Sequence, residues 1–225
     1  MRQIQGAVFD VDGTLLDSME IWENLSERYL ESMGVKPEPG LSRILNTMST
    51  RQGTQYLIEH YGLQLDIRQA MEGINKMLYG FYSCEAPLKE GVAECLEELK
   101  RQKIPMIVVT SSDRVNVEAA FTRHGILSYF QEILTCSEMH TDKTKPDIFL
   151  EAARRLQAAP ADILVFEDVL HALKTAGKAG FQTAAVFDRY SAGQEKEIRE
   201  TADYYLKTFK EFSTCAAKCT LRSEQ

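Results

Sequence analysis

Short apolar runs rich in Val, Ile and Phe alternate along the chain with longer segments of helical periodicity. The apolar runs predict five strands and a weaker sixth, at Gln5–Asp10, Pro105–Thr110, Glu132–Thr135, Ile163–Glu167, Thr183–Phe187 and Tyr204–Leu206. Helices are predicted before or between these strands, at Lys89–Gln102, Arg114–His124, Asp147–Gln157 and Val169–Ala179. Strands that alternate with helices are typical of a parallel sheet in an α/β fold.

Residues 17–85 break this alternation, because they contain helical patterns and no convincing strand. Asp17 and Glu20 predict a capping box for the first helix of the stretch. Further helices are predicted at Ser42–Thr47, Arg51–Tyr61 and Asp66–Tyr82. A crossover between parallel strands needs only about a dozen residues, so a longer helical block indicates an inserted domain. We therefore predict an α-helical cap domain inserted in a Rossmann-like core of residues 1–16 and 86–225.

The first predicted strand runs into Asp10-Val11-Asp12-Gly13-Thr14. Side chains alternate along a strand, so Asp10 and Asp12 are expected on the same side, and Gly13 permits a sharp turn. Ligands of open parallel sheets bind at the carboxyl ends of the strands, where these carboxylates lie. The same residues also form ordinary turns, but a D-x-D-G-T sequence is expected by chance in only about a few chains per thousand.

The second predicted strand closes with Thr110-Ser111-Ser112, just before a helix with a predicted cap near Asp113. Hydroxyl groups and free backbone N–H groups at a helix start bind anions such as phosphate. An ordinary Ser or Thr helix cap is the alternative interpretation of these residues.

Lysines and acids follow the next two predicted strands. Lys143 and Lys145 stand just before the helix at Asp147, at positions where solvated surface lysines are also common. The fourth strand ends in Glu167-Asp168, and adjacent acids repel one another unless a cation offsets their charge. Carboxylates without His or Cys suit magnesium, and an activated carboxylate is a competent nucleophile toward phosphorus. Together, these strand ends predict phosphoryl transfer.

These motifs resemble those of the haloacid dehalogenase superfamily phosphohydrolases that carry a helical cap, near the β-phosphoglucomutase-like phosphatases. They occur in the family's order along essentially the whole chain: Asp10-Val11-Asp12-Gly13-Thr14, Thr110-Ser111-Ser112, a lysine before Pro146-Asp147, and Phe166-Glu167-Asp168. The resemblance implies a sheet core and a cap that closes over the site to exclude water.

The resemblance also implies roles for the motif residues. Asp10 would be the nucleophile, and Asp12 would protonate the leaving oxygen and then activate water. Ser111 or Thr110, with Ser112 beside them, would bind the transferring phosphoryl group. A lysine would neutralise the charge of that group and hold the nucleophile in place.

Two lysines are candidates for this last role, because the chain has Lys143-Thr144-Lys145-Pro146-Asp147 where many relatives have Lys-Pro-x-Pro-Asp. Counting back from Asp147 favours Lys143, whereas adjacency to proline favours Lys145. We take Lys143 as the catalytic lysine.

A magnesium cofactor is part of the same resemblance. Asp10, the backbone carbonyl of Asp12, and Asp168 would bind the ion, and Glu167 would either bind it directly or contact one of its ligands.

The resemblance also concerns one residue of the cap. Mutase-like relatives place an arginine at the start of a cap helix, where it binds a distal phosphate. Arg51 stands at such a position, although a solvated surface arginine is equally expected there.

The predicted activity is magnesium-dependent hydrolysis of a small phosphomonoester, such as a sugar phosphate, through an aspartyl-phosphate intermediate. Asp12 argues against the dehalogenase and phosphonatase branches of the family, which lack an acid at that position. A sugar-phosphate mutase of the β-phosphoglucomutase type is the alternative, although Trp22 stands near the position of its usual cap histidine. A non-enzymatic phosphoaccepting or phosphate-sensing domain is a further alternative, but receiver-type domains lack a long helical insertion.

Composition narrows the choice of partners. The 225 residues include 26 Lys+Arg and 33 Asp+Glu, and this net charge of -7 argues against nucleic acid or an anionic membrane. No apolar run approaches the roughly 20 residues that span a bilayer, and no signal-peptide pattern opens the chain. The five cysteines, with Cys215 and Cys219 in a predicted helical tail, are expected to be reduced. We expect a cytoplasmic monomer that binds a small phosphorylated metabolite.

Overall fold

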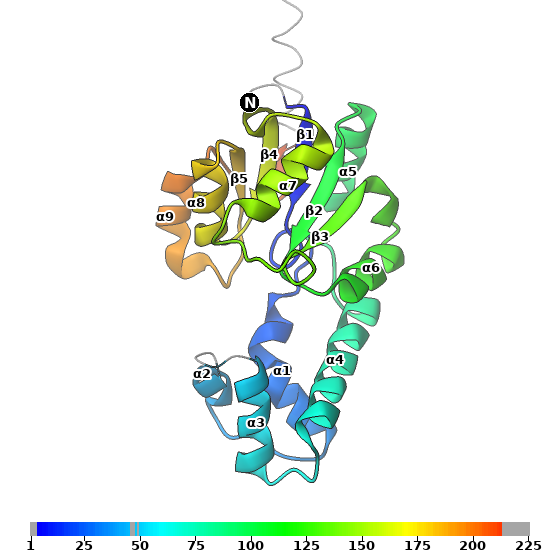
Figure 1. Cartoon of the computed structure of the whole chain (residues 1–225), viewed down its shortest axis with the longest axis vertical. Helices are drawn as coiled ribbons and strands as arrows, with labels where there is room; N and C mark the ends of the chain where they lie inside the picture. The colour runs from blue at the N-terminus through cyan, green and yellow to red at the C-terminus, as the bar shows by residue number, and fades with distance from the viewer. Residues whose placement is uncertain (1–3, 46–47, 49, 213–225) are drawn as a thin grey trace, which may run out of the picture. The chain divides into compact units, whose positions relative to one another are not determined.

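The computed structural model describes residues 4–45, 48 and 50–212. The chain divides into two compact units, which we call the sheet unit (Met1–Asp17 and Ala86–Gln225) and the helical unit (Ser18–Glu85). The predictions for Thr47, Cys215 and Cys219 lie outside the described residues. Figure 1 shows the strands and helices of each unit.

Within the described residues of the sheet unit, six strands form one sheet in the order β3-β2-β1-β4-β5-β6. Their bounds are β1 (Gly6–Phe9), β2 (Met106–Thr110), β3 (Glu132–Thr135), β4 (Ile163–Glu167), β5 (Gln182–Val186) and β6 (Tyr204–Leu206). Every neighbouring pair is parallel. The predicted α/β fold, with a parallel sheet and a helical insertion between its first two strands, is therefore confirmed.

Both faces of this sheet are covered, which explains why its strands are almost uninterrupted apolar runs. Val8 and Val165 belong to a cluster with Ile148 and Phe149, and so pack on the helix α7 (Asp147–Leu156), which crosses in front of the strands in Figure 1. Phe9 alternates with Val8, faces the other side and stacks on Phe166 with ring centroids 4.5 Å apart.

The helices of the sheet unit precede or connect the strands. They are α5 (Val92–Arg101), α6 (Arg114–Arg123), α7, α8 (Leu170–Lys178) and α9 (Glu195–Thr201). The predicted start of α5 at Lys89 is wrong, because the helix begins after Gly91, whose φ of 85° is left-handed. The sequence pattern did not predict α9, a short helix with Ile198 as its one buried residue.

Four helices are described in the helical unit, namely α1 (Met19–Ser32), α2 (Leu41–Leu45), α3 (Thr50–Tyr61) and α4 (Ile67–Cys84). Helices α1 and α3 both contact α4. Gly73 of α4 allows a close approach, since a Cβ there would lie 2.7 Å from the ring of Tyr29. None of the helices in the described part of the chain is long and apolar enough to cross a membrane.

The helical unit also corrects one predicted cap. The capping box expected at Asp17 is absent, because Ser18 is the N-cap of α1 and the backbone N–H of Asp17 donates to the Pro87 carbonyl at 2.9 Å. A capping box instead opens α4, where Asp66 and Gln69 exchange hydrogen bonds of 2.8 and 2.9 Å.

Candidate active site

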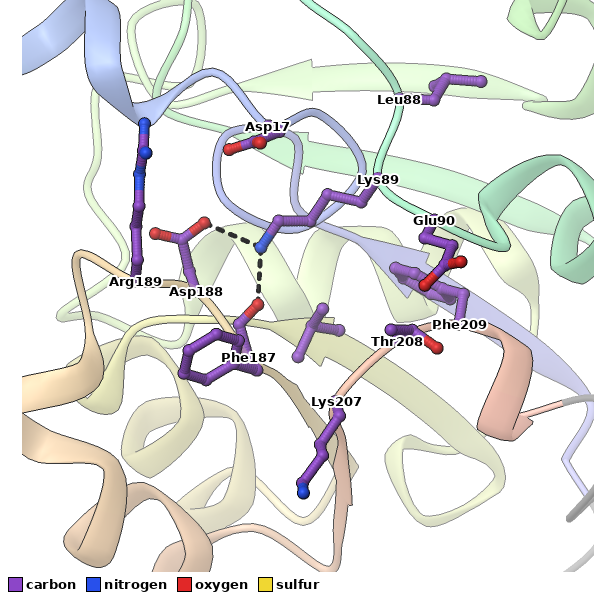
Figure 2. A pocket seen from close by; sticks show the side chains of 11 residues that line it. Asp17, Leu88, Lys89, Glu90, Phe187, Asp188, Arg189, Lys207, Thr208 and Phe209 are labelled. Atoms are coloured by element: carbon purple, nitrogen blue, oxygen red, sulfur yellow. Dashed lines mark hydrogen bonds and ion pairs between the residues drawn. The ribbon is translucent and has the colours of Figure 1, made fainter.

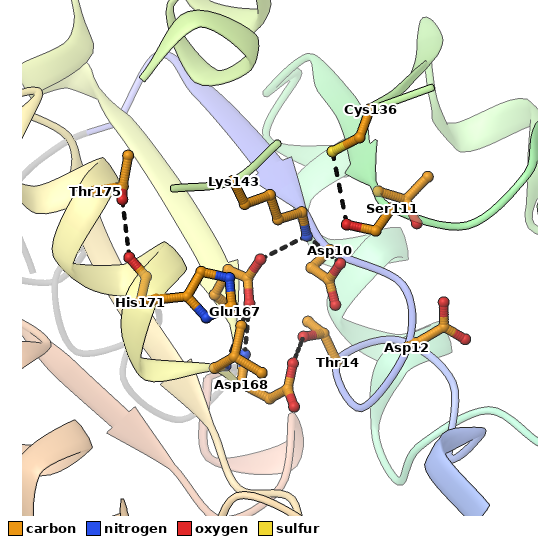
Figure 3. Close-up of polar contacts among 12 residues, drawn as sticks. Asp10, Asp12, Thr14, Ser111, Cys136, Lys143, Glu167, Asp168, His171 and Thr175 are labelled. Carbon is orange, nitrogen blue, oxygen red and sulfur yellow. Dashed lines mark hydrogen bonds and ion pairs between the residues drawn. The ribbon is translucent and has the colours of Figure 1, made fainter. Parts of the chain in front are cut away.

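Asp10 follows directly after β1 and is 7% exposed. Its backbone N–H donates to the carbonyl of Phe166 in β4 at 3.0 Å, which continues the pairing between the two strands past the end of β1. Because β1 and β4 are neighbours in a parallel sheet, their carboxyl ends meet at one edge. Asp10 therefore lies beside Glu167 and Asp168, both fully buried (Figure 3).

Lys143 lies between two of these acids. Its Nζ donates to Oδ1 of Asp10 and, at 2.6 Å, to Oε1 of Glu167, and only 5% of its side chain is exposed. Burial alone would lower the pKa of Lys143, but the charges of Asp10 and Glu167 outweigh burial and raise that pKa well above its usual value. Lys143 is thus held as a cation at this edge of the sheet.

The acids outnumber this one ammonium group. Burial, together with the charge of Asp10, raises the pKa of Glu167 to about 7, although Lys143 opposes the shift. Burial and the charges of Glu167 and Asp10 also raise the pKa of Asp168 well above its usual value. Such shifts mean that the negative charge gathered here is not fully neutralised by the surrounding protein.

The same three acids have the arrangement of a metal site. One carboxylate oxygen from each of Asp10, Glu167 and Asp168 lies within 4.8 Å of the other two. Oxygen ligands of this kind suit a hard divalent cation such as Mg²⁺, and a bound cation would lower the raised pKa values. The donor set therefore fits the predicted magnesium ion.

Asp12 makes a different contact. Its Oδ2 accepts a hydrogen bond of 2.5 Å from Oγ of Ser112, and Figure 3 shows its carboxylate apart from the contacts of Asp10 with Lys143. Neither Asp10 nor Asp12 belongs to the strand, because β1 already ends at Phe9, and the expectation that the two carboxylates face the same side stays a prediction. The metal-binding prediction for Asp12 concerned its backbone carbonyl and stays a prediction.

The three predicted hydroxyl residues after β2 differ in their surroundings. Thr110 is buried, and its Oγ1 accepts a hydrogen bond of 3.0 Å from the backbone N–H of Ser112. Ser111 is exposed, and its Oγ lies 3.6 Å from Sγ of Cys136 at the end of β3. Ser111 is therefore the exposed residue among these three, and its contact with a phosphoryl group stays a prediction.

Two other predicted residues lie outside this cluster. Lys145 is exposed, whereas Lys143, two residues earlier, is buried against Asp10. Arg51 is exposed on α3 of the helical unit. Its predicted contact with a distal phosphate stays a prediction.

Two residues that the sequence did not single out hold Asp168. Thr14 Oγ1 donates to Oδ1 of Asp168 at 3.2 Å, and Ser191 Oγ donates to Oδ2 at 3.3 Å. Thr14 is the last residue of the D-x-D-G-T motif, and this position in the motif could have indicated that it contributes to the site. Ser191 lies in the loop after β5, within no motif, and only the fold brings it to Asp168.

Residues 7–186 match the family model of the haloacid dehalogenase-like hydrolases. The chain belongs to this family. This match confirms the predicted family. The match and the phosphatases among its relatives confirm the predicted enzyme class, a haloacid dehalogenase-like phosphatase.

Three known proteins are similar to this chain over most of its length. The fructose-1-phosphate phosphatase of Escherichia coli is 28% identical and aligns over 80% of this chain and 95% of its own length. A phosphorylated carbohydrates phosphatase of Thermotoga maritima is 26% identical, over 80% of this chain and 83% of its own. The crystal structure of CbbY from Rhodobacter sphaeroides in complex with phosphate superimposes with a TM-score of 0.74, at 25% identity, over 92% of this chain and 95% of that one.

Proposed function

We propose that this protein is a magnesium-dependent phosphatase that hydrolyses a small phosphomonoester, such as a sugar phosphate, through an aspartyl-phosphate on Asp10. The observation that carries the proposal is the contact of a buried lysine with a buried aspartate at the end of β1. Lys143 fixes Asp10 through Oδ1, and the acids of β4 lie beside the pair. This arrangement would orient Asp10 for attack on a phosphoryl group bound beside it.

In the first step, a carboxylate oxygen of Asp10 attacks phosphorus and the bond from phosphorus to the ester oxygen breaks. The leaving oxygen takes a proton from Asp12, and the product is the free alcohol. The positive charge of Lys143 offsets the charge of the phosphoryl oxygens, and Ser111 donates a hydrogen bond to one of them.

In the second step, Asp12, now a carboxylate, takes a proton from water as that water attacks the phosphorus of the aspartyl-phosphate. The bond from phosphorus to Asp10 breaks, and inorganic phosphate leaves. Asp12 must reach the reacting group in both steps, so its contact with Ser112 at 2.5 Å is a resting position that the reaction exchanges for the substrate.

Magnesium would be held by Asp10 and Asp168, with Glu167 beside it, and when bound would neutralise charge on the phosphoryl group. The proximity of the three acids and the raised pKa values of Glu167 and Asp168 support this assignment. Sugar phosphates are the first substrates to test, because two similar enzymes are a fructose-1-phosphate phosphatase and a phosphorylated carbohydrates phosphatase.

The test is phosphate release from p-nitrophenyl phosphate and a panel of sugar phosphates, with MgCl₂ and with EDTA. We expect magnesium-dependent release, with one group of sugar phosphates preferred. A single turnover in ¹⁸O-labelled water then tests which atom the water attacks. Water attacks phosphorus in the proposed mechanism, so the label should enter phosphate and not Asp10. Label in Asp10 would contradict it.

No release from any ester would contradict hydrolysis. Conversion of a hexose 1-phosphate into the 6-phosphate in the same assay would favour the mutase alternative instead. Phosphate release that persists in EDTA would remove magnesium from the proposal while leaving the nucleophile in place.

A further inference from the structure

Lys89 is a second lysine of the sheet unit whose charge is largely buried, and it belongs to no predicted motif. It lies in the segment before α5, and 13% of its side chain is exposed. Figure 2 shows its ammonium group pointing between the loop after β1 and the loop after β5. Its Nζ lies 2.5 Å from the Gly13 carbonyl, 2.6 Å from the Phe187 carbonyl and 2.8 Å from Oδ2 of Asp188. These contacts use all three ammonium protons.

The two loops that Lys89 joins are the same loops that hold Asp168. Thr14, which follows Gly13, donates to Oδ1 of Asp168, and Ser191, three residues after Asp188, donates to Oδ2. Both carboxylate oxygens of Asp168 thus accept hydrogen bonds from residues one and three positions away from a Lys89 contact. A shift of either loop would move a hydrogen-bond donor of this acid.

Gly13 is restrained at both of its backbone polar groups. Its N–H donates to the Leu16 carbonyl at 2.9 Å, and its carbonyl accepts from Lys89. The residue packs directly on Asp168, since a Cβ at Gly13 would lie 2.5 Å from Oδ2 of that acid. The peptide that carries the Asp12 carbonyl ends at Gly13, so the same restraint orients a predicted metal ligand.

These loops have room to move if the restraint is lost. Lys89, Phe187 and Asp188 line a cavity of about 270 Å³ that also borders Asp17 and Lys207 (Figure 2). Asp188 is 3% exposed, so without Lys89 its carboxylate would be left without the ammonium that faces it. Relaxation of the loop into the cavity would then relieve that buried charge.

We propose that Lys89 is a positioning residue for the metal site, because it fixes the loops after β1 and β5 that orient Asp168 and the Asp12 carbonyl. The inference rests on the proposed magnesium site and extends it to a residue that touches neither metal nor substrate. Outer groups that orient metal ligands commonly contribute about 10- to 100-fold to metal affinity. Lys89 therefore acts on magnesium affinity more than on the chemistry of Asp10.

The test measures the Mg²⁺ dissociation constant of the metal-free protein by isothermal titration calorimetry. Lys89→Met removes the ammonium group, and Lys89→Met combined with Asp188→Asn removes it without leaving a buried unpaired carboxylate. Lys210→Met is the matched control, because this exposed lysine pairs with Glu90 at 2.5 Å, next to Lys89 in the sequence. Urea unfolding of each variant reports its stability separately.

We expect both Lys89 variants to bind Mg²⁺ about 10-fold more weakly than the parent. The double variant should recover stability without recovering metal affinity, and Lys210→Met should bind as the parent does. Parent-like Mg²⁺ affinity in the double variant would overturn the role of Lys89 and leave the proposed phosphatase intact. A parent that binds no Mg²⁺ would overturn the magnesium site itself, and this inference with it.

Discussion

Glutamates pair with basic side chains in two different settings within the sheet unit. On the outside of α7, Glu151 pairs with Arg154 at 2.6 Å and with Arg155 at 2.7 Å. At the end of β4, Glu167 pairs with Lys143 at 2.6 Å. The contact distances are alike, yet hydrogen bonds from Arg154 and Arg155 lower the pKa of Glu151 to about 2, whereas burial raises that of Glu167 to about 7.

The difference comes from the solvent around each glutamate. Water solvates and screens the groups on α7, so their ion pairs form at little cost and contribute little. At the end of β4 desolvation opposes every charge, and one ammonium faces more than one carboxylate. A buried set of acids with excess negative charge gains most from an added cation. Burial, and not the presence of an ion pair, therefore distinguishes the candidate cation site at the end of β4 from the ion pairs on the surface of α7.

Replacement of the nucleophile should have the largest effect. Asp10→Asn keeps the shape of the side chain but removes the attacking carboxylate, so kcat should fall by at least ~10⁴-fold. Thermal unfolding should show a folded protein with a midpoint no lower than the parent's, because one of several crowded negative charges is gone. Phosphate release above one tenth of the parent rate would contradict the assigned nucleophile.

The two lysines before α7 test the effect of burial directly, because they are two residues apart in the sequence and only Lys143 is buried. Lys143→Ala should lower kcat by at least ~100-fold and destabilise the protein by about 3 kcal/mol, because it leaves buried acids without their cation. Lys145→Ala changes an exposed lysine. It should leave kcat within twofold of the parent value and the free energy of unfolding within about 0.5 kcal/mol of it. Steady-state kinetics and urea unfolding measure them. The reverse ranking would make Lys145 the catalytic lysine.

Two glycines with left-handed backbone conformations allow the same comparison, between a residue at the site and one away from it. Gly13 has a φ of 81° and Gly34 one of 74°, but only a Cβ at Gly13 would meet Asp168. Alanine at either position should destabilise the protein by about 1 kcal/mol through backbone strain. Gly13→Ala should in addition lower phosphatase activity by about 10-fold, by displacing Asp168. Equal activities of the two variants would argue against a constrained metal loop.

The smallest effect is expected on the outside of α7. The pKa of Glu151 is lowered in the folded protein, so its charge favours folding above the ordinary value of 4.5, and this contribution disappears as the pH falls toward 2. Glu151→Gln should therefore lower the urea midpoint slightly at pH 7, and the gap should close in acid. A gap that stays constant with pH would show that packing, and not charge, explains the change.

Strand predictions succeeded because β1, β2, β4 and β5 are buried along their whole length. Continuous apolar runs such as Ile163–Glu167 therefore stand out from the polar segments around them, and three of the six predicted strands have the observed bounds. Helix starts were harder, because caps depend on contacts that a local pattern does not contain. Asp17 has a capping sequence, yet its N–H is used by the Pro87 carbonyl, far along the chain.

The choice between Lys143 and Lys145 shows the same limit within the site. Both lysines precede the same helix, and motif spacing and adjacency to proline pointed to different ones. Only the fold of the loop after β3 decides which ammonium reaches Asp10. Ser191 and Lys89 lie in no motif at all, so the sequence did not predict the contact of Ser191 with Asp168 or those of Lys89 with the loops after β1 and β5.

By itself, the sequence determined the fold class, the family and the set of chemical groups, because each of these is written in local residue order. Apolar runs specify buried strands, and D-x-D-G-T with Glu167-Asp168 specifies acids at strand ends. Tertiary structure alone decided which charged groups lie close enough to interact electrostatically. Parallel pairing of β1 with β4 brings Asp10 to Glu167, and burial then makes the charge of Glu167 depend on Lys143 and Asp10. Desolvation and distance are properties of packing, and packing joins residues that are far apart in the chain.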